Sequence, residues 1–141
     1  MNEKKLYEQE LSEGDLQTFV GQVITEIKRL EPFCLLLEGP LGSGKTTFAQ
    51  FLIRSLIPTV SNVQSPTFNI VNGYEDEKHI VSHLDLYRLK HQDELLEIGF
   101  EEFLYSGITI IEWPELAENI IHKNKASNLK SKLTKHVNAL S

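Results

Sequence analysis

The residues best suited to chemistry form one glycine-rich run, Gly39-Pro40-Leu41-Gly42-Ser43-Gly44-Lys45-Thr46. Its spacing matches G-x-x-x-x-G-K-[ST], and the run lies between an apolar segment and an amphipathic one, as a phosphate-binding loop requires. Glycines let the backbone turn its N–H groups toward an anion, and the helix that follows adds its positive end. We expect Lys45 to reach the β- and γ-phosphates and the Thr46 hydroxyl to bind Mg²⁺. The run therefore predicts a site for an ATP-type nucleotide with one Mg²⁺.

Two acidic residues that can complete this site each follow an apolar run. Asp85 follows residues 80–84, and Glu112 follows residues 108–111. Open α/β sheets bind their ligands at the carboxyl ends of parallel strands, so both carboxylates are expected beside the loop. The sequence leaves open which of them binds Mg²⁺ directly and which acts through water. Both are candidate metal ligands and, with Lys45, candidate catalytic residues.

Thr67 and Trp113 are weaker candidates for the same site. Thr67 follows Pro66 at a distance from the loop where nucleotide switches place a residue that senses the γ-phosphate. A polar strand start explains Thr67 equally well. Trp113 adjoins Glu112 and is interpreted as a core residue, a cover for the site or a contact for a partner. The two histidines His79 and His83 have no metal-ligand partners at suitable spacing and are interpreted as structural.

The remaining sequence predicts strands that alternate with helices. Apolar or alternating runs predict strands at 6–11, 33–37, 67–74, 80–84 and 108–111, and a further strand at 128–133. Helical spacing predicts helices from Ser12 to about Arg29, from Thr46 to Ile57 and from Pro114 to about Ile121, with two short helices at 93–103 separated by Gly99. This order indicates the P-loop NTPase fold, an α/β architecture with a mostly parallel central sheet, flanking helices and an antiparallel edge hairpin at 67–84.

Composition bounds the class of protein. The 141 residues suit one domain, and the 40% hydrophobic and 24% charged content is typical of a globular protein. No apolar run approaches the ~20 residues of a membrane span, and the N-terminus lacks the features of a signal peptide. Cys34 is the only cysteine, which excludes a disulfide framework. We therefore expect a cytoplasmic protein without a membrane partner.

Charge is unevenly distributed along the chain. Residues 122–141 hold five lysines and no acid, although the net charge of the whole chain is −6. We expect residues 1–121 to form the P-loop ATPase domain and residues 122–141 to be a basic C-terminal tail, a shortened part of the same domain. The tail is suited to contact RNA or an acidic partner, or is simply a solvated terminus.

Together these segments resemble the TsaE (YjeE) family, the small bacterial P-loop ATPases required for threonylcarbamoyladenosine (t6A) modification of tRNA. The resemblance rests on residues 39–48 (GPLGSGKTTF), 65–68 (SPTF), 83–89 (HLDLYRL), Gly99 and 111–114 (IEWP), in the family's order and spacing. The first motif alone is generic, whereas the combination is specific.

The resemblance implies an ATPase that acts on the TsaB–TsaD complex, which modifies adenosine 37 of tRNAs reading codons that begin with A. It also implies that this chain acts on tRNA indirectly, through that complex. By motif, Thr46 and Glu112 would bind Mg²⁺, Asp85 would be needed for the ATP cycle, Thr67 would belong to a switch and Trp113 would lie near the nucleotide. The expected nucleotide-binding residues are Leu11, Gly39, Gly42, Ser43, Gly44, Lys45, Thr46 and Thr47.

Three other classes of function are weighed against the partner-driven ATPase. A nucleotide-dependent assembly module needs only the loop, Thr46 and an acid, and no arginine finger is obvious in the sequence, so we expect hydrolysis that is slow alone and stimulated by partners. A small-molecule kinase would need an arginine-rich lid, which is not visible. A GTPase is disfavoured because Asp85 is followed by Leu86-Tyr87-Arg88 rather than by the Asp-x-x-Gly switch.

Overall fold

A six-stranded sheet is the frame of the molecule. The computed structural model describes residues 8–11, 16–123 and 127–133, and within these the strand order is β1-β6-β2-β5-β4-β3. In chain order the strands are β1 Glu8–Leu11, β2 Phe33–Glu38, β3 Val71–Glu75, β4 Ile80–Asp85, β5 Ile108–Glu112 and β6 Ser127–Leu133. Every neighbouring pair is parallel except β3 and β4. The predicted fold, a mostly parallel sheet with an antiparallel edge hairpin, is confirmed.

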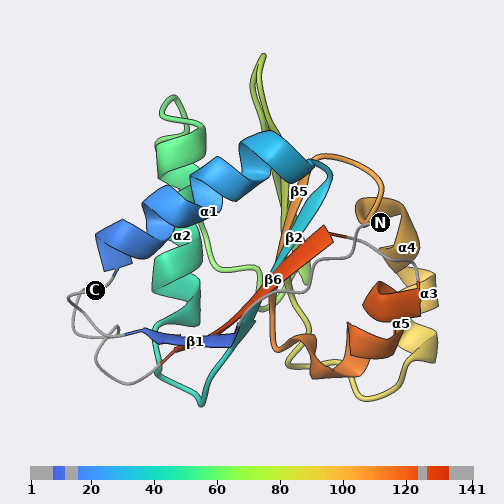
Figure 1. Ribbon diagram of the computed structural model, residues 1–141. Helices are drawn as coiled ribbons and strands as arrows, with labels where there is room; N and C mark the ends of the chain where they lie inside the picture. The colour runs from blue at the N-terminus through green and yellow to red at the C-terminus, as the bar shows by residue number, and fades with distance from the viewer. Residues whose placement is uncertain (1–7, 12–15, 124–126, 134–141) are drawn as a thin grey trace.

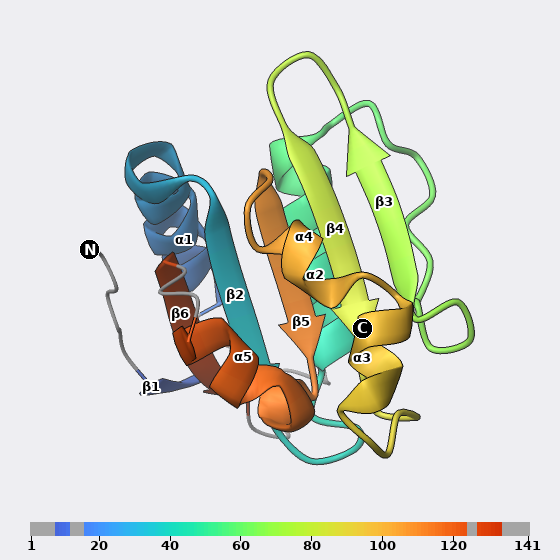
Figure 2. The ribbon, with the colours of Figure 1, turned by 90° about the vertical axis from the view of Figure 1, so that its right-hand side faces the viewer.

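Helices cover both faces of this sheet (Figures 1 and 2). One layer consists of α1 Leu16–Leu30 and α2 Lys45–Leu56. The other consists of α3 Asp93–Glu97, α4 Phe100–Phe103, the 3₁₀ helix η2 Pro114–Ala117 and α5 Glu118–Lys123. Within the described ranges, no helix is both long enough and apolar enough to cross a bilayer.

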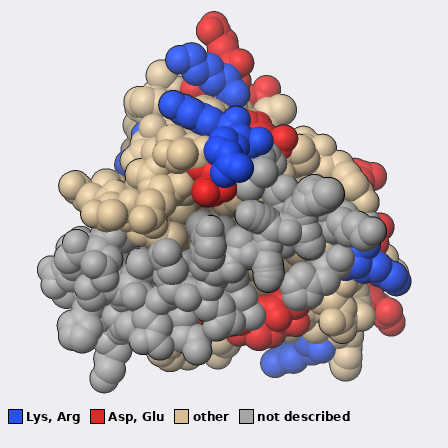
Figure 3. All heavy atoms as spheres, in the orientation of Figure 1, with Lys and Arg blue, Asp and Glu red and all other residues tan. Residues whose placement is uncertain are grey.

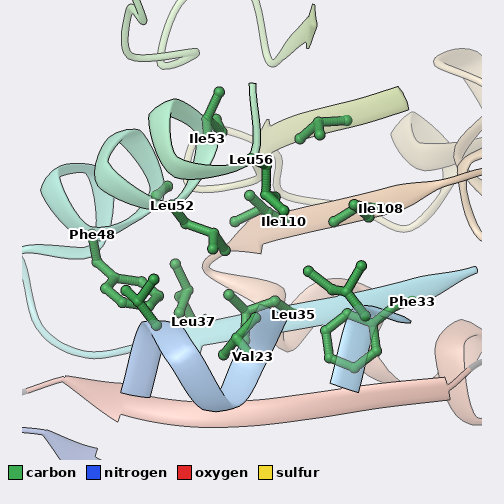
Figure 4. Close-up of a cluster of buried hydrophobic side chains, with 14 of the residues drawn as sticks. Val23, Phe33, Leu35, Leu37, Phe48, Leu52, Ile53, Leu56, Ile108 and Ile110 are labelled. Atoms are coloured by element: carbon green, nitrogen blue, oxygen red, sulfur yellow. The ribbon is translucent and has the colours of Figure 1, made fainter. Parts of the chain in front are cut away.

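The central strands β2 and β5 are buried on both faces. All five residues of β5 are buried, as are Phe33 to Leu37 of β2. Successive side chains of a strand point to opposite faces, so Leu35 and Leu37 join α1 and α2 in one core, whereas Cys34 and Leu36 join the other layer. The first core is shown in Figure 4. Burial on both faces explains why these strands read as continuous apolar runs.

The parallel register brings the predicted acids to one edge of the sheet. Leu37 pairs with Glu112, and Glu112 pairs with Asp85. The carboxyl ends of β2, β5 and β4 therefore meet at the edge where the chain leaves β2 for the glycine-rich loop. His83 lies two residues before Asp85 on β4 and pairs with Ile110, so it shares a face with both carboxylates.

One predicted strand is shorter than expected. The strand expected from Thr67 begins at Val71, and residues 67–70 instead form a turn. The Ile70 N–H donates to the Pro66 carbonyl at 2.6 Å, and the Ile70 carbonyl accepts the Asp85 N–H at 3.0 Å. Ile70 has φ 70°, a left-handed conformation that is rare for a β-branched residue and that cannot continue a strand. The turn fastens the segment that holds Thr67 to the end of β4.

The other predicted elements differ little. Gly99, at φ 69°, separates the two short helices as expected, and the helix expected at Pro114 starts as the 3₁₀ turn η2. The strand expected at 128–133 is β6, which pairs with β2 and β1. The start of the first predicted helix at Ser12, the first residues of the predicted N-terminal strand and residues 134–141 lie outside the described residues.

Figure 3 shows one face of the molecule. On its described part, Lys and Arg atoms gather toward the top, and Asp and Glu atoms lie beside them.

Candidate nucleotide-binding site

The glycine-rich loop joins the end of β2 to the start of α2. Gly42 and Gly44 have φ of 78° and 99°, left-handed conformations that glycine adopts without strain. Gly44 precedes the first residue of α2 and caps it without a side-chain hydrogen bond, and its carbonyl accepts the first helical bond from Phe48 N–H at 2.9 Å. The N–H groups of the first helical turn therefore point toward the loop, where an anion is favoured.

Lys45 is folded back over this loop. Its side chain is 5% exposed, and Nζ donates to the Gly39 carbonyl at 2.7 Å and to the Pro40 carbonyl at 3.0 Å. Nζ also lies 4.0 Å from the centre of the Trp113 ring. Burial lowers the pKa of Lys45, and the charges of Glu112 and two further acids oppose this. The Lys45 amine is thus held by two neutral carbonyl oxygens and the face of an aromatic ring. The negatively charged oxygens of a phosphate group would bind it more strongly than these neutral partners do.

Glu112 connects the loop helix to the sheet. Its Oε1 accepts the Thr46 hydroxyl at 2.7 Å, and its Oε2 lies 2.7 Å from His83 Nε2. Glu112 is 2% exposed and His83 is fully buried. The hydrogen bond between Thr46 and Glu112 joins residues that are 66 positions apart in the sequence. It places the hydroxyl and the carboxylate that the sequence predicted as metal ligands side by side.

Asp85 forms a second, separate network. Its Oδ2 accepts the Thr67 hydroxyl at 3.2 Å, and its Oδ1 accepts the Tyr87 N–H at 3.0 Å. Thr67 Oγ1 in turn lies 2.7 Å from Ser65 Oγ. Burial raises the pKa of Asp85, the Tyr87 bond opposes this and the Glu112 charge adds to it. The structure therefore places Thr67 at the site, where the sequence had left its role open.

A cavity of about 290 Å³ lies between these networks. It is lined by Leu41, Gly42, Ser43, Gly44, Lys45, Thr46, Thr47, Thr67, Asp85, Tyr87, Glu112 and Trp113. Trp113 has φ 57° and donates its N–H to the Leu37 carbonyl at 3.3 Å. Its ring lies 4.8 Å from that of Tyr87 at an angle of 45°. The aromatic pair forms one wall, and the loop and the carboxylates form the others.

Comparison with known proteins decides the family. The family described as "Threonylcarbamoyl adenosine biosynthesis protein TsaE" matches residues 10–139. The chain belongs to the TsaE family. This membership confirms the resemblance found in the motifs of the sequence.

Individual relatives agree with this assignment. The chain is 40% identical over 87 residues to "tRNA threonylcarbamoyladenosine biosynthesis protein TsaE" of Rickettsia felis, a match that covers 62% of this chain and 51% of the relative. Proteins of the same name from Aquifex aeolicus and Nostoc are 39% identical over 105 residues and 46% identical over 85 residues. These matches cover 74% and 57% of this chain, and 73% and 52% of the two relatives. The chain thus spans about half the length of the Rickettsia felis and Nostoc relatives.

A solved structure shows the same fold. The crystal structure of Bacillus subtilis YdiB superposes with a TM-score of 0.50 and 28% sequence identity. The superposition covers 74% of this chain and 63% of that one. It supports the α/β architecture predicted from the alternation of strands and helices.

Most predicted site residues of this TsaE-family chain line the cavity. Gly39 is not among the lining residues, but its carbonyl accepts a hydrogen bond from Lys45, which is. Leu11 is the last residue of β1 and pairs with Leu133. The side chains of β1 are outside the description, so the nucleotide-binding role of Leu11 stays a prediction. Leu41 and Tyr87 also line the cavity, although neither is a predicted site residue. Both were signalled only by their positions, one inside the loop and one two residues after Asp85.

The donors at this corner suit Mg²⁺. The Thr46 hydroxyl and the carboxylates of Glu112 and Asp85 are hard oxygen ligands, which Mg²⁺ prefers. Within the described part of the chain, no group of three or more His, Cys, Asp and Glu side chains converges as a metal cage. Mg²⁺ usually takes only one or two protein ligands and completes its shell with phosphates and water. The residues present therefore fit a cation that arrives with a nucleotide.

Proposed function

We propose that this chain is the ATP-binding, slowly hydrolysing subunit of t6A biosynthesis, acting in the cytoplasm on the TsaB–TsaD complex that modifies adenosine 37 of tRNA. Membership of the TsaE family and the names of the relatives support the pathway. The observation that carries the nucleotide chemistry is the 2.7 Å contact between Thr46 and Glu112, which joins the phosphate loop to the carboxyl end of β5.

Each residue has a proposed part in that chemistry. The loop N–H groups and Lys45 bind the phosphates, and Lys45 exchanges the Gly39 and Pro40 carbonyls for phosphate oxygens. Thr46 holds the cation directly, with Glu112 bonded to the Thr46 hydroxyl, and the cation neutralises charge on the phosphates. Asp85, already bonded to Thr67, orients the segment that senses the γ-phosphate. Trp113 covers Lys45 and lies beside the phosphates.

Slow hydrolysis follows from the charges at the cavity. Among the described residues that line it, Lys45 is the one cationic side chain. Arg88 lies with its guanidinium carbon 5.3 Å from the Phe68 ring, outside the lining. An added arginine typically accelerates phosphoryl transfer by ~10³–10⁵. The chain therefore turns over slowly until a partner supplies charge or order.

ATP hydrolysis with and without purified TsaB–TsaD tests this proposal. We expect a low basal rate, stimulation by the complex and loss of the stimulated rate in Glu112→Ala. Reconstituted formation of t6A on tRNA should require both the chain and ATP. If t6A forms equally well without the chain, or if GTP is clearly preferred to ATP, the proposal is wrong.

The same cavity charges favour one alternative, a nucleotide-dependent assembly module. In that case the chain would bind ATP and promote assembly without turnover. The two functions separate when a non-hydrolysable ATP analogue replaces ATP in the reconstituted reaction. Full, repeated support of t6A formation by the analogue would favour the assembly module over the ATPase.

A further inference from the structure

His83 is a buried imidazole that faces the carboxylate at the phosphate loop. Its side chain is fully buried, and Nε2 lies 2.7 Å from Glu112 Oε2. The other oxygen of Glu112 accepts the hydroxyl of Thr46 at 2.7 Å. The Glu112 carboxylate is therefore bonded through one oxygen to α2 and through the other to β4.

The hydrogen bonds assign the proton of the imidazole. A carboxylate only accepts, so His83 Nε2 must carry a hydrogen to bond Glu112. His83 Nδ1 is buried and has no hydrogen-bond partner among the described residues. The geometry thus places a hydrogen on Nε2.

This bond fixes an otherwise loose torsion. The terminal torsion of a glutamate side chain is broad and nearly two-fold, so packing alone does not define where its oxygens point. The register places His83 opposite Ile110 and Asp85 opposite Glu112, so His83 reaches Glu112 diagonally across the two strands. With Oε2 held by His83, Oε1 is directed at Thr46.

We propose that His83 is a positioning residue, which holds the Glu112 carboxylate toward Thr46 and thereby sets the affinity of the site for its divalent cation. The inference rests on the proposed nucleotide and Mg²⁺ binding. Outer residues that orient metal ligands typically contribute 10–100-fold to metal affinity. A histidine that only filled the core would contribute packing and leave the cation unaffected once the protein is folded.

A matched pair of variants separates these two roles. Methionine and glutamine have similar length and shape, but only the glutamine amide can donate to Glu112 from the position of Nε2. Binding of Mn²⁺, as a probe for the cation, is measured by electron paramagnetic resonance with a non-hydrolysable ATP analogue bound. We expect His83→Met to weaken Mn²⁺ binding ~10–100-fold and His83→Gln to lie closer to the wild type than to His83→Met. Binding of the nucleotide in EDTA should be the same in all three proteins.

Two results would overturn the role of His83. One is equal Mn²⁺ affinity in the two variants, whether both are intact or both are weakened, and the other is a parallel loss of nucleotide binding in EDTA. Nitrogen NMR of the imidazole in the wild-type protein tests the same bond without any variant, so misfolding of His83→Met leaves the proposal testable. The Nδ1–H tautomer in that spectrum would contradict it. If the wild type itself binds no Mn²⁺ with nucleotide, the proposed function fails instead.

Discussion

Replacing Asp85 with asparagine should stabilise the fold near neutral pH although it removes a carboxylate from the site. Asp85 is 5% exposed, and its oxygens accept only the Tyr87 N–H and the Thr67 hydroxyl among the bonds described. Burial raises its pKa above 3.8, and the charge of Glu112 raises it further, against the lowering effect of the two bonds. Asparagine keeps an acceptor for Tyr87 without carrying the buried charge.

The sign of the pH dependence follows from that raised pKa. The folded state holds the Asp85 proton more tightly than the unfolded state, so stability falls as pH rises from about 3.8 through the folded pKa. The gain from Asp85→Asn is therefore complete above the folded pKa and disappears as the pH approaches 3.8. A stabilising substitution of this kind typically raises the free energy of unfolding by about 0.5–2 kcal/mol. For a chain of this size that is a rise of roughly 2–7 °C in the melting temperature.

Urea unfolding in EDTA without nucleotide measures this difference at about pH 7 and about pH 4. Asp76→Asn is the matched control in the exposed β3–β4 turn. There the backbone N–H groups of His79 and Lys78 lower the pKa of Asp76, so its carboxylate stabilises the fold above pH 3.8 and the substitution should act in the opposite direction. An Asp85→Asn protein that is no more stable than the wild type near pH 7, or equally more stable at both pH values, would refute the reasoning.

Three further outcomes are expected. Burial raises the pKa of Cys34 to about 12, so a thiol reagent near pH 8 should modify it only when denaturant unfolds the protein, as mass spectrometry would show. Gly107→Ala should lower the stability by roughly 2 kcal/mol or more, because the added Cβ would collide with the Ile80 carbonyl oxygen and because Gly107 has φ +65°. Gly21→Ala is the control: it lies in α1, its added Cβ would have nothing within 4 Å, and it should raise the stability by about 0.5–1 kcal/mol. Trp113 is the only tryptophan, so nucleotide binding should change its emission as Lys45 leaves its ring for the phosphates, and Lys45→Met should abolish that change. An unchanged spectrum at saturating nucleotide would contradict the proposed position of Trp113.

The phosphate loop and its two acids could be predicted because their signals are local. A glycine pattern between an apolar strand and a helix fixes the loop, and an acid directly after an apolar run fixes its place at a strand end. Which acid meets Thr46 depends on how far each carboxylate extends across the sheet edge, and that is a tertiary property. In the structure, Glu112 accepts the hydroxyl of Thr46, and Asp85 accepts the hydroxyl of Thr67.

The contacts of Thr67 and His83 depend on tertiary structure that their local sequence does not show. The turn that brings Thr67 to Asp85 depends on Ile70 in a left-handed conformation, which β-branched residues rarely adopt, and on a bond from the Asp85 backbone. Metal-ligand spacing along the chain offers His83 no partner, so the sequence alone indicates a structural role. A usable signal was present: His83 and Asp85 alternate onto one strand face. The pairing with Glu112 still required the register of β4 against β5.

The distribution of buried polar groups argues that this corner exists for a ligand. The buried polar or charged residues among those described are Ser43, Lys45, His83, Asp85, Thr109 and Glu112. Ser43, Lys45, Asp85 and Glu112 line the cavity, and His83 is bonded to Glu112. Thr109 is the remaining one, and its hydroxyl donates to the Phe103 carbonyl at 2.9 Å. Burying polar groups is costly unless they are paired, and within the described structure Ser43 Oγ has no partner. A bound phosphate would accept that hydroxyl and balance the charge of Lys45, so nucleotide should stabilise the fold.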